Sequence, residues 1–192
     1  MQNDPISFLE SRAASEPAFD LIAFANSLWY FSSPSRIQST LATAAKYAAR
    51  VAIAEYTLHA SPSLGPAAIP HVYAAFAQAA LEMHKPTSVS NIRTVVDPKA
   101  ITALATEANL KMVQEDSFIP AADVDDAHWE TGIVRSAGFL EEVKTTLAEN
   151  GRERALVLAL REAMLASIND IPEGRKGIRM MDVWCAVFES AR

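Results

Sequence analysis

Glycine is scarce and late in this chain. Its 192 residues include six glycines, and the first of them is Gly65. Loops that hold dinucleotides or nucleoside phosphates need clustered glycines, because the backbone must approach the ligand closely. The first third of the chain therefore contains neither a Rossmann dinucleotide loop nor a P-loop.

Patterns for disulfides and metal sites are also lacking. The single cysteine, Cys185, excludes an internal disulfide and a cysteine-based zinc cluster, and its apolar surroundings predict a buried, inert thiol. His71 and His84 lie 13 residues apart, which separates them by more than three turns of a helix. The acidic run 123–126 lacks the glycine and the terminal glutamate of a calcium loop. We predict no metal site.

Long hydrophobic runs and basic charge are missing as well. No apolar run approaches the roughly 18 to 20 residues that cross a bilayer, and residues 1–5 do not follow the plan of a secretory signal. A net charge of -6 and a pI near 5.2 disfavour a phosphate-backbone partner. We expect a soluble, cytoplasmic protein of one large domain with no membrane or nucleic-acid partner.

The most informative segment that is present covers residues 19–31. Residues 21–25 are apolar without alternation, which is typical of a strand covered on both faces. Asn26 and Ser27 then supply the first polar side chains, at the strand end where open α/β sheets keep their ligands. The alternative is that the aromatic residues of 28–31 only fill the core under a loop.

The segments that follow predict an α/β fold. Ser33 and Pro34 begin a helix that runs to residue 49, and residues 50–58 form a second strand. A strand, helix and strand in this spacing form a βαβ unit with parallel strands. The later predicted elements are a helix from Ile69 to near Pro86, a helix capped by Asp97, a strand at 111–118, a loop at 119–138, helices at 139–150 and 152–168, and a closing strand at 178–188.

Several segments together resemble the C-terminal half of class I S-adenosylmethionine-dependent methyltransferases of a fungal small-molecule type. They are Phe19-Asp20-Leu21-Ile22-Ala23-Phe24-Ala25-Asn26-Ser27-Leu28-Trp29-Tyr30-Phe31, Val51-Ala52-Ile53-Ala54-Glu55-Tyr56, Pro70-His71-Val72, Ser90-Asn91-Ile92-Arg93-Thr94 and Met181-Asp182-Val183-Trp184.

The resemblance implies an α/β fold with a partial Rossmann-like sheet. Its strands correspond to the fourth to seventh of the family, the last one antiparallel, with helices on both faces. The whole of residues 1–192 then forms a single, incomplete methyltransferase-like domain. Residues 1–18 are an N-terminal extension, and 119–138 are a loop insertion.

The departure from the family concerns the cofactor. The resemblance implies S-adenosylmethionine, but the family places a first strand and its glycine-rich loop upstream, and here only about 18 residues precede the first predicted strand. The chain alone lacks the larger part of the methyl-donor site. The missing strand would also leave 20–25 as an apolar edge. We expect this edge to pair with another chain or a second copy, or to be covered by residues 6–15, unless the chain is an incomplete product of a longer gene.

Site residues after the first strand follow from the resemblance. Asn26, Ser27 and Trp29 occupy the position beside the transferred methyl group and the adenine, so they are cofactor-binding candidates. Tyr30 is a substrate-binding candidate in the same segment. The alternative is that these polar groups only cap the strand end.

Asn91 and Arg93 resemble residues of an active-site lid, and both are substrate-binding candidates. Arg93 could clamp an acidic substrate. A salt bridge to the acidic protein surface is an equal alternative for Arg93.

A third group of candidates lies in the predicted loop. His128, Trp129 and Glu130 combine a histidine, an aromatic ring and a carboxylate, which could supply a general base and a stacking surface for an aromatic substrate. His71 or His128 would be the catalytic base if the acceptor is a hydroxyl group. The alternative is that Trp129 anchors the loop in the core.

Three functions remain open from the sequence. The first is a methyltransferase-like protein whose ancestor transferred a methyl group to a small molecule. The second is a non-catalytic interaction module that completes or regulates a partner methyltransferase. The third is a cofactor-independent enzyme that reuses the substrate pocket.

Overall fold

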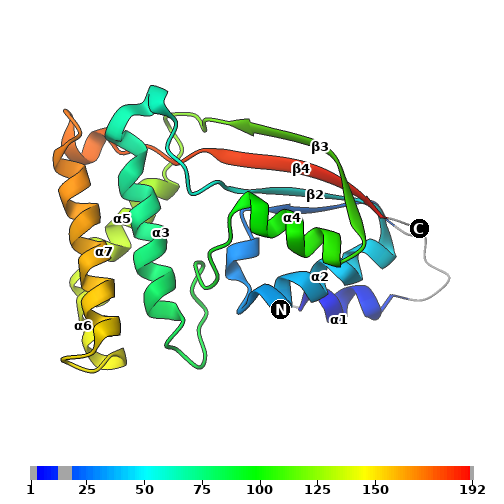
Figure 1. The fold of residues 1–192 in the computed structure, drawn as a ribbon, viewed down its shortest axis with the longest axis horizontal. Coiled ribbons are helices and arrows are strands. Elements are labelled where there is room, and N and C mark those ends of the chain that lie inside the picture. Colours follow the sequence, from blue (N-terminus) through cyan, green and yellow to red (C-terminus); the bar gives the residue numbers. More distant parts are fainter. Residues whose placement is uncertain (1–3, 13–18, 191–192) are drawn as a thin grey trace.

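A four-stranded mixed sheet forms the spine of the protein (Figure 1), and the computed structural model describes residues 4–12 and 19–190. The strand order is β1-β2-β4-β3. β1 and β2 are parallel, and β4 runs antiparallel to both β2 and β3. The predicted partial Rossmann-like sheet with an antiparallel last strand is confirmed. The strands are β1 (Phe19–Ala25), β2 (Ala48–Tyr56), β3 (Leu110–Phe118) and β4 (Val183–Ser190).

Capping explains where two helices begin. The Ser33 side chain accepts a hydrogen bond from the Arg36 backbone N–H at the start of α2 (Pro34–Tyr47), and Asp97 accepts one from Ala100 at the start of α4 (Pro98–Glu107). Each helix has proline in its first turn, where a missing N–H leaves no bond unmade. Both helices bury an apolar stripe, including Ile37 and Leu41 in α2 and Ile101 in α4.

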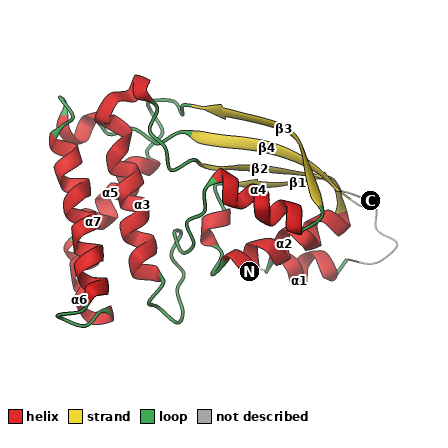
Figure 2. Ribbon diagram, in the orientation of Figure 1, coloured by secondary structure: helices red, strands yellow, loops and turns green. Residues whose placement is uncertain are grey.

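These two helices cover the same face of the sheet (Figure 2). The expectation of helices on both faces is not met within 4–12 and 19–190. Right-handed crossovers that advance in one direction along a sheet place their helices on one face. The connections from β1 to β2 and from β2 to β3 both advance in this way, so α2 and α4 lie together.

The other face of the sheet carries small and apolar side chains without a helix above them among the described residues. Leu21 is 50% exposed. Cys185 is only partly buried on this face, which corrects the expectation of a buried thiol, although burial still raises its pKa. A groove of about 200 Å³ on this face is lined chiefly by Ala23, Ala25, Ala52, Ala54, Cys185 and Val187.

The short helix α1 (Pro5–Glu10) packs against α2. Its Asp4 cap accepts a hydrogen bond from Ser7 and forms an ion pair with Arg36. Residues 13–15 lie outside the described residues, so the predicted cover of the β1 edge by 6–15 can be followed only through residue 12. Asp20, Leu21 and Ala23 of β1 remain exposed.

A helical bundle stands at the end of the sheet where β1, β2 and β3 finish (Figure 1). α3 packs against α7 and α5. The bundle consists of α3 (Ile69–Glu82), α5 (Asp126–Arg135), α6 (Ala137–Thr146) and α7 (Arg152–Asn169), and the 3-10 segments are η1 (Leu28–Tyr30), η2 (Pro62–Ala68) and η3 (Gly174–Gly177).

Two predicted boundaries were wrong. The loop predicted at 119–138 contains α5, which buries Ala127, Thr131 and Val134 along one side. The acidic run that precedes α5 and the glycine at position 132 are typical of loops, so the helical spacing of the buried residues was not recognised in the sequence. The closing strand begins at Val183 rather than at residue 178, because the Arg179 and Asp182 N–H groups donate to Ala67 and His59 outside the sheet.

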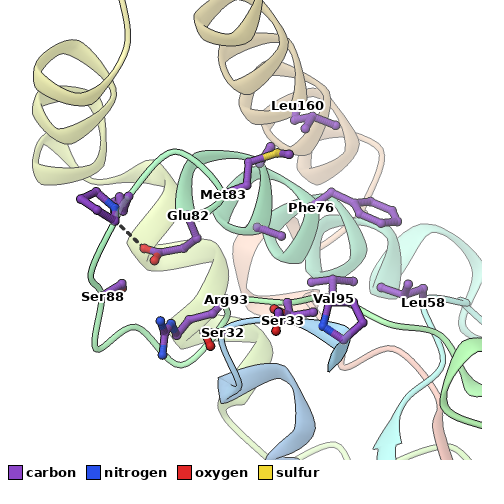
Figure 3. Close-up of a pocket in the computed structure, with 16 residues that line it drawn as sticks. Ser32, Ser33, Leu58, Phe76, Glu82, Met83, Ser88, Arg93, Val95 and Leu160 are labelled. Carbon is purple, nitrogen blue, oxygen red and sulfur yellow. Dashed lines mark hydrogen bonds and ion pairs between the residues drawn. The ribbon is translucent and has the colours of Figure 1, made fainter. Parts of the chain in front are cut away.

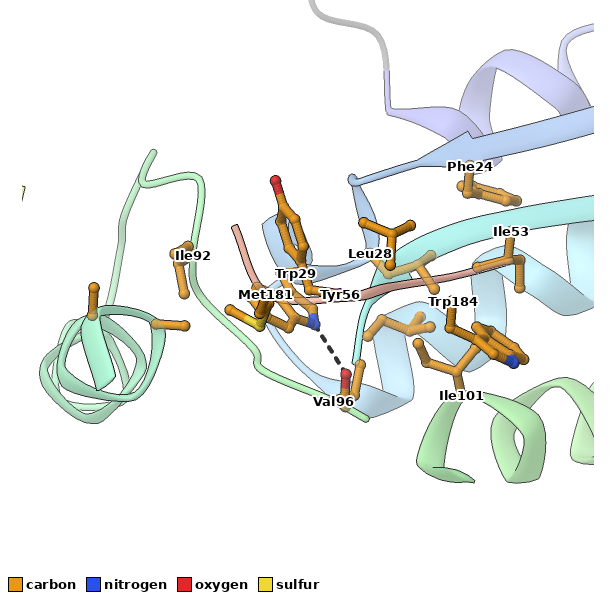
Figure 4. Packing of buried hydrophobic residues seen from close by; sticks show 14 of the residues in the cluster. Phe24, Leu28, Trp29, Ile53, Tyr56, Ile92, Val96, Ile101, Met181 and Trp184 are labelled. Atoms are coloured by element: carbon orange, nitrogen blue, oxygen red, sulfur yellow. Dashed lines mark hydrogen bonds between the residues drawn. The ribbon is translucent and has the colours of Figure 1, made fainter. Parts of the chain in front are cut away.

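The core runs between the sheet and α2 and α4 and continues under the bundle. Trp29, Tyr56 and Met181 lie together where the sheet meets the bundle, while Trp184 packs beneath the strands (Figure 4). None of the helices in the described part of the chain is long and apolar enough to cross a membrane.

Candidate functional site

A small cavity lies at the carboxyl ends of β1 and β2. Its volume is about 130 Å³, which is less than a typical small-molecule site of roughly 300 to 1,000 Å³. Carboxyl ends of neighbouring parallel strands meet at one edge, so their terminal side chains converge there. The lining residues are Asn26, Trp29, Tyr30, Glu55, Tyr56, Asn91, Ile92, Asp126, Trp129 and Glu130.

Asn26 turns the chain at the end of β1. Its φ is 44°, a left-handed conformation that asparagine tolerates better than most residues, and its N–H donates to Ala54 O at 2.8 Å. Its side-chain oxygen Oδ1 is buried and has no hydrogen-bond partner among the described residues. A buried acceptor without a donor is costly, so a donor on a bound molecule would be favourable here.

Glu55 is the most buried acid of the cavity, with 1% of its surface exposed. Its Oε2 accepts a hydrogen bond from Leu28 N–H at 2.9 Å, and its Oε1 accepts one from Tyr56 N–H at 3.1 Å. Burial raises the pKa of Glu55 to about 7, and the hydrogen bonds from backbone N–H groups offset only part of that effect. The group therefore changes its charge near neutral pH.

Two further carboxyl groups reach the cavity from α5. Asp126 accepts a hydrogen bond from the Tyr56 hydroxyl at 2.9 Å, and Glu130 accepts one from Gln78 Nε2 at 2.5 Å. Burial, then Asp126, raises the pKa of Tyr56, so its phenol stays protonated. Burial and the charge of Asp126 also raise the pKa of Glu130, against the opposing bond from Gln78.

Aromatic rings form the rest of the wall. Trp29 is 2% exposed, and its ring centroid lies 5.3 Å from that of Tyr56. Tyr30 and Trp129 are 48% and 65% exposed. Burial, followed by the charge of Glu130, raises the pKa of Tyr30. Aromatic faces beside carboxylates suit a cationic group or a flat ring.

The structure brings together six of the candidate residues predicted from the sequence. They are Asn26, Trp29, Tyr30, Asn91, Trp129 and Glu130. Ser27 stands before η1 and does not line the cavity. Arg93 lines a different cavity. The core-anchor alternative for Trp129 is wrong, since the side chain is largely exposed.

The two histidine candidates do not line the cavity. His71 is fully buried behind Tyr56, where its Nδ1 accepts a hydrogen bond from Met181 N–H at 3.1 Å and burial lowers its pKa to about 3. His128 lies two residues from both Asp126 and Glu130, so it points to another side of α5. A catalytic role of either residue stays a prediction from the sequence.

Four lining residues were not predicted as site residues, namely Glu55, Tyr56, Ile92 and Asp126. Glu55 and Tyr56 end an apolar parallel strand, and an acid at that position is a recognisable signal for a site. Asp126, Trp129 and Glu130 have the i, i+3, i+4 spacing of one helix face, but the loop interpretation concealed it.

Comparisons with known proteins agree with this fold. No family model matches the chain. It is 29% identical over 191 residues to methyltransferase phomM' and 28% identical over 189 residues to methyltransferase phomM, both from Diaporthe leptostromiformis. Each match covers 88% of this chain and 49% of the relative, so the chain spans about half the length of these curated relatives.

The solved structure of a cyclopropane-fatty-acyl-phospholipid synthase-like protein from Lactobacillus casei superposes with a TM-score of 0.73 at 23% identity. The match covers 97% of this chain and 61% of that one, and it shows the fold. The predicted resemblance is confirmed: in sequence and fold this chain is methyltransferase-like.

Proposed function

We propose that this chain forms the substrate side of an S-adenosylmethionine-dependent methyltransferase-like domain that acts on a small molecule. The observation that carries the proposal is the cavity of carboxyl groups and aromatic rings at the carboxyl ends of β1 and β2. Similarity to fungal methyltransferases over 88% of the chain supports the reaction class.

The cavity residues fit part of the proposed cofactor. When bound, S-adenosylmethionine supplies an activated methyl group on a sulfonium cation. Carboxylates such as Asp126 and the rings of Trp29 and Trp129 suit that cation or the adenine. A volume of about 130 Å³ cannot enclose the whole molecule, and no glycine precedes Gly65 to form a loop around its methionine part. The described residues therefore fit only part of the cofactor.

The chain's own residues can place an acceptor and take up its proton. The exposed rings of Tyr30 and Trp129 would hold a flat acceptor at the mouth of the cavity. Glu55 is ionised in part at neutral pH and can accept a proton from a hydroxyl group within hydrogen-bond reach. His71 is neutral and enclosed, so Glu55 is the better-placed base.

Titration calorimetry with S-adenosylmethionine tests the proposal. We expect weak binding by the isolated chain, with a dissociation constant of about 1 mM or somewhat below, because only part of the ligand finds partners. Trp129→Ala should weaken it severalfold by removing the exposed ring. Leu156→Ala, at a residue 56% exposed on α7, is the matched control and should bind like the wild type. Absence of heat at several millimolar ligand would contradict the proposal.

A second candidate function is a module that completes a partner methyltransferase. The observations that favour it are the unpaired outer edge of β1 in the described residues and the apolar groove beside it. The occupant would be a polypeptide that adds a strand beside β1 and helices over the open face. This chain covers only 61% of the structural neighbour, so the neighbour has further chain that a partner polypeptide would supply here.

An apolar sheet edge also attracts copies of itself, which makes the second candidate testable. Light scattering after size exclusion should show a mass that rises above 20.8 kDa with concentration. Ala23→Lys, which puts a charge on the exposed edge strand, should restore the monomer, while Ala103→Lys on the exposed side of α4 should not. A wild-type chain that stays monomeric throughout would count against an adhesive β1 edge, on which this candidate rests. The third possibility, a cofactor-independent enzyme, has no observation that favours it.

A further inference from the structure

A second and larger cavity lies next to the candidate site. Its volume is about 820 Å³, and it lies between α3, residues 32–34 and the segment that follows α3 (Figure 3). Residues 91–95 separate the two cavities, since Ile92 lines the first, and Arg93, Thr94 and Val95 line the second. The Arg93 and Thr94 N–H groups donate to Trp29 O at 2.8 and 3.0 Å and hold this partition in place.

Most of the wall is apolar. Phe76 and Met83 are 37% and 74% exposed, which is unusual for large apolar side chains in one cavity. A volume of this size is typical of a site for a whole small molecule. The apolar lining residues are Leu58, Phe76, Ala79, Ala80, Met83, Pro86, Val95 and Leu160.

Arg93 brings a charge to this apolar cavity. It is partly buried, and its guanidinium group has no hydrogen-bond or ion-pair partner in the described part of the chain. The other cation of the cavity, Lys85, is already bound to Glu82 and Glu142 at 2.5 Å each. Arg93 is therefore the cation that remains available to a ligand, and a guanidinium group prefers a carboxylate.

Glu82 provides a hydrogen-bond acceptor in the same cavity as Arg93. Its side chain is 6% exposed, and Oε1 is bound to Lys85. Oε2 is buried and has no partner among the residues described. Figure 3 shows Glu82 and Arg93 on one side of the cavity and Phe76, Val95 and Leu58 on the other. Lys85 offsets part of the negative charge of Glu82, and Oε2 of Glu82 still needs a donor.

We propose that this cavity binds an amphipathic carboxylic acid that carries a hydrogen-bond donor near the carboxylate. The carboxylate pairs with Arg93, the donor, a hydroxyl or N–H group, reaches Glu82, and the apolar body lies along Phe76, Ala80 and Leu160. The site needs no cofactor, so the inference does not rest on methyl transfer. Binding by the full chain is sufficient to test it.

The experiment is calorimetric titration with 3-hydroxydecanoate, N-octanoylglycine, decanoate and decan-1-ol, all below their aggregation concentrations. The wild type should bind decanoate about tenfold or more tightly than decan-1-ol, because a charge-assisted pair is formed. One or both of the donor-bearing acids should bind about threefold or more tightly than decanoate. If 3-hydroxydecanoate binds more tightly than N-octanoylglycine, the preferred donor is a hydroxyl group, and the reverse order of affinity indicates an amide N–H.

Variants locate the site. Arg93→Gln should lower the affinity for decanoate about tenfold and leave decan-1-ol unchanged, while Arg93→Lys keeps part of the affinity. Ala80→Trp fills the cavity and should abolish binding of all four probes. Arg152→Gln, at an exposed arginine that begins α7, is the matched control. Circular dichroism will check that each variant is folded. Because Arg93 has no hydrogen-bond or ion-pair partner among the described residues, its replacement removes no internal bond.

Three results would overturn the proposal. The first is equal affinity of the wild type for decanoate and decan-1-ol. The second is full affinity of Arg93→Gln for decanoate. The third is that neither donor-bearing acid binds more tightly than decanoate. The outcome of the S-adenosylmethionine titration affects none of these measurements, so the two proposals fail independently.

Discussion

Trp29→Ala will lower the free energy of unfolding by about 3 to 5 kcal/mol, the usual cost of removing a buried large aromatic side chain. The indole is 2% exposed and packs against Tyr56. Its Nε1 donates to Val96 O at 3.0 Å, so truncation also leaves a buried carbonyl without its donor (Figure 4). The loss should be visible in urea unfolding followed by circular dichroism.

Trp129 is the matched control, because it is the same residue type at 65% exposure beside the same cavity. Trp129→Ala should change the free energy of unfolding by less than about 1 kcal/mol. Trp29→Phe keeps most of the packing and loses only the hydrogen bond, so we expect a loss of about 1 to 2 kcal/mol. Equal losses at Trp29 and Trp129 would show that the placement of these two side chains is wrong.

Glu55 will contribute a decrease of about 3 kcal/mol to the free energy of unfolding as the pH rises from about 4.5 to about 7. Burial raises the pKa of this carboxyl from 4.5 to about 7. In that window the folded state retains a proton that the unfolded state has released, so the contribution is complete below pH 4.5 and is lost as the pH passes 7. Above that pH the contribution is constant.

Urea unfolding of the wild type and of Glu55→Gln at several pH values between about 4.5 and 8 measures this contribution as the difference between their two pH slopes. Burial also raises the pKa of Glu130, which adds a change of the same sign, and lowers the pKa of His71, which adds a change of the opposite sign. The difference between the wild type and Glu55→Gln therefore isolates Glu55. Glu107→Gln, at an exposed residue that ends α4, is the control and should keep the wild-type slope. If Glu55→Gln and the wild type share one slope, Glu55 does not titrate in this window.

Local signals predicted much of the fold because they act within a few residues. Ser33 and Asp97 begin helices through bonds to N–H groups three residues away, and proline in the first turn strengthens both. The apolar run of β1 and the β-branched residues of β2 marked two parallel strands. The resemblance supplied the antiparallel β4, whose partners lie far away in the sequence.

The site was predicted less completely, because its members come from distant segments. Asn26 and Trp29 were found by their place after β1, but Glu55 was not singled out, because its function depends on burial that no local pattern reports. Asp126 fell in the loop predicted at 119–138, whereas it begins α5 and accepts a hydrogen bond from Tyr56.

The amino-acid pattern alone indicated an α/β chain with no early glycine loop, since such features depend on short-range periodicity and residue type, and the family resemblance added the methyltransferase-like strand order. Contacts between distant segments settled everything that depends on environment. They enclosed His71 and lowered its pKa to about 3, raised the pKa of Glu55 to about 7, and left Arg93 without a partner in its cavity among the described residues. The physical reason is that burial and charge pairing arise only when residues far apart in the chain meet.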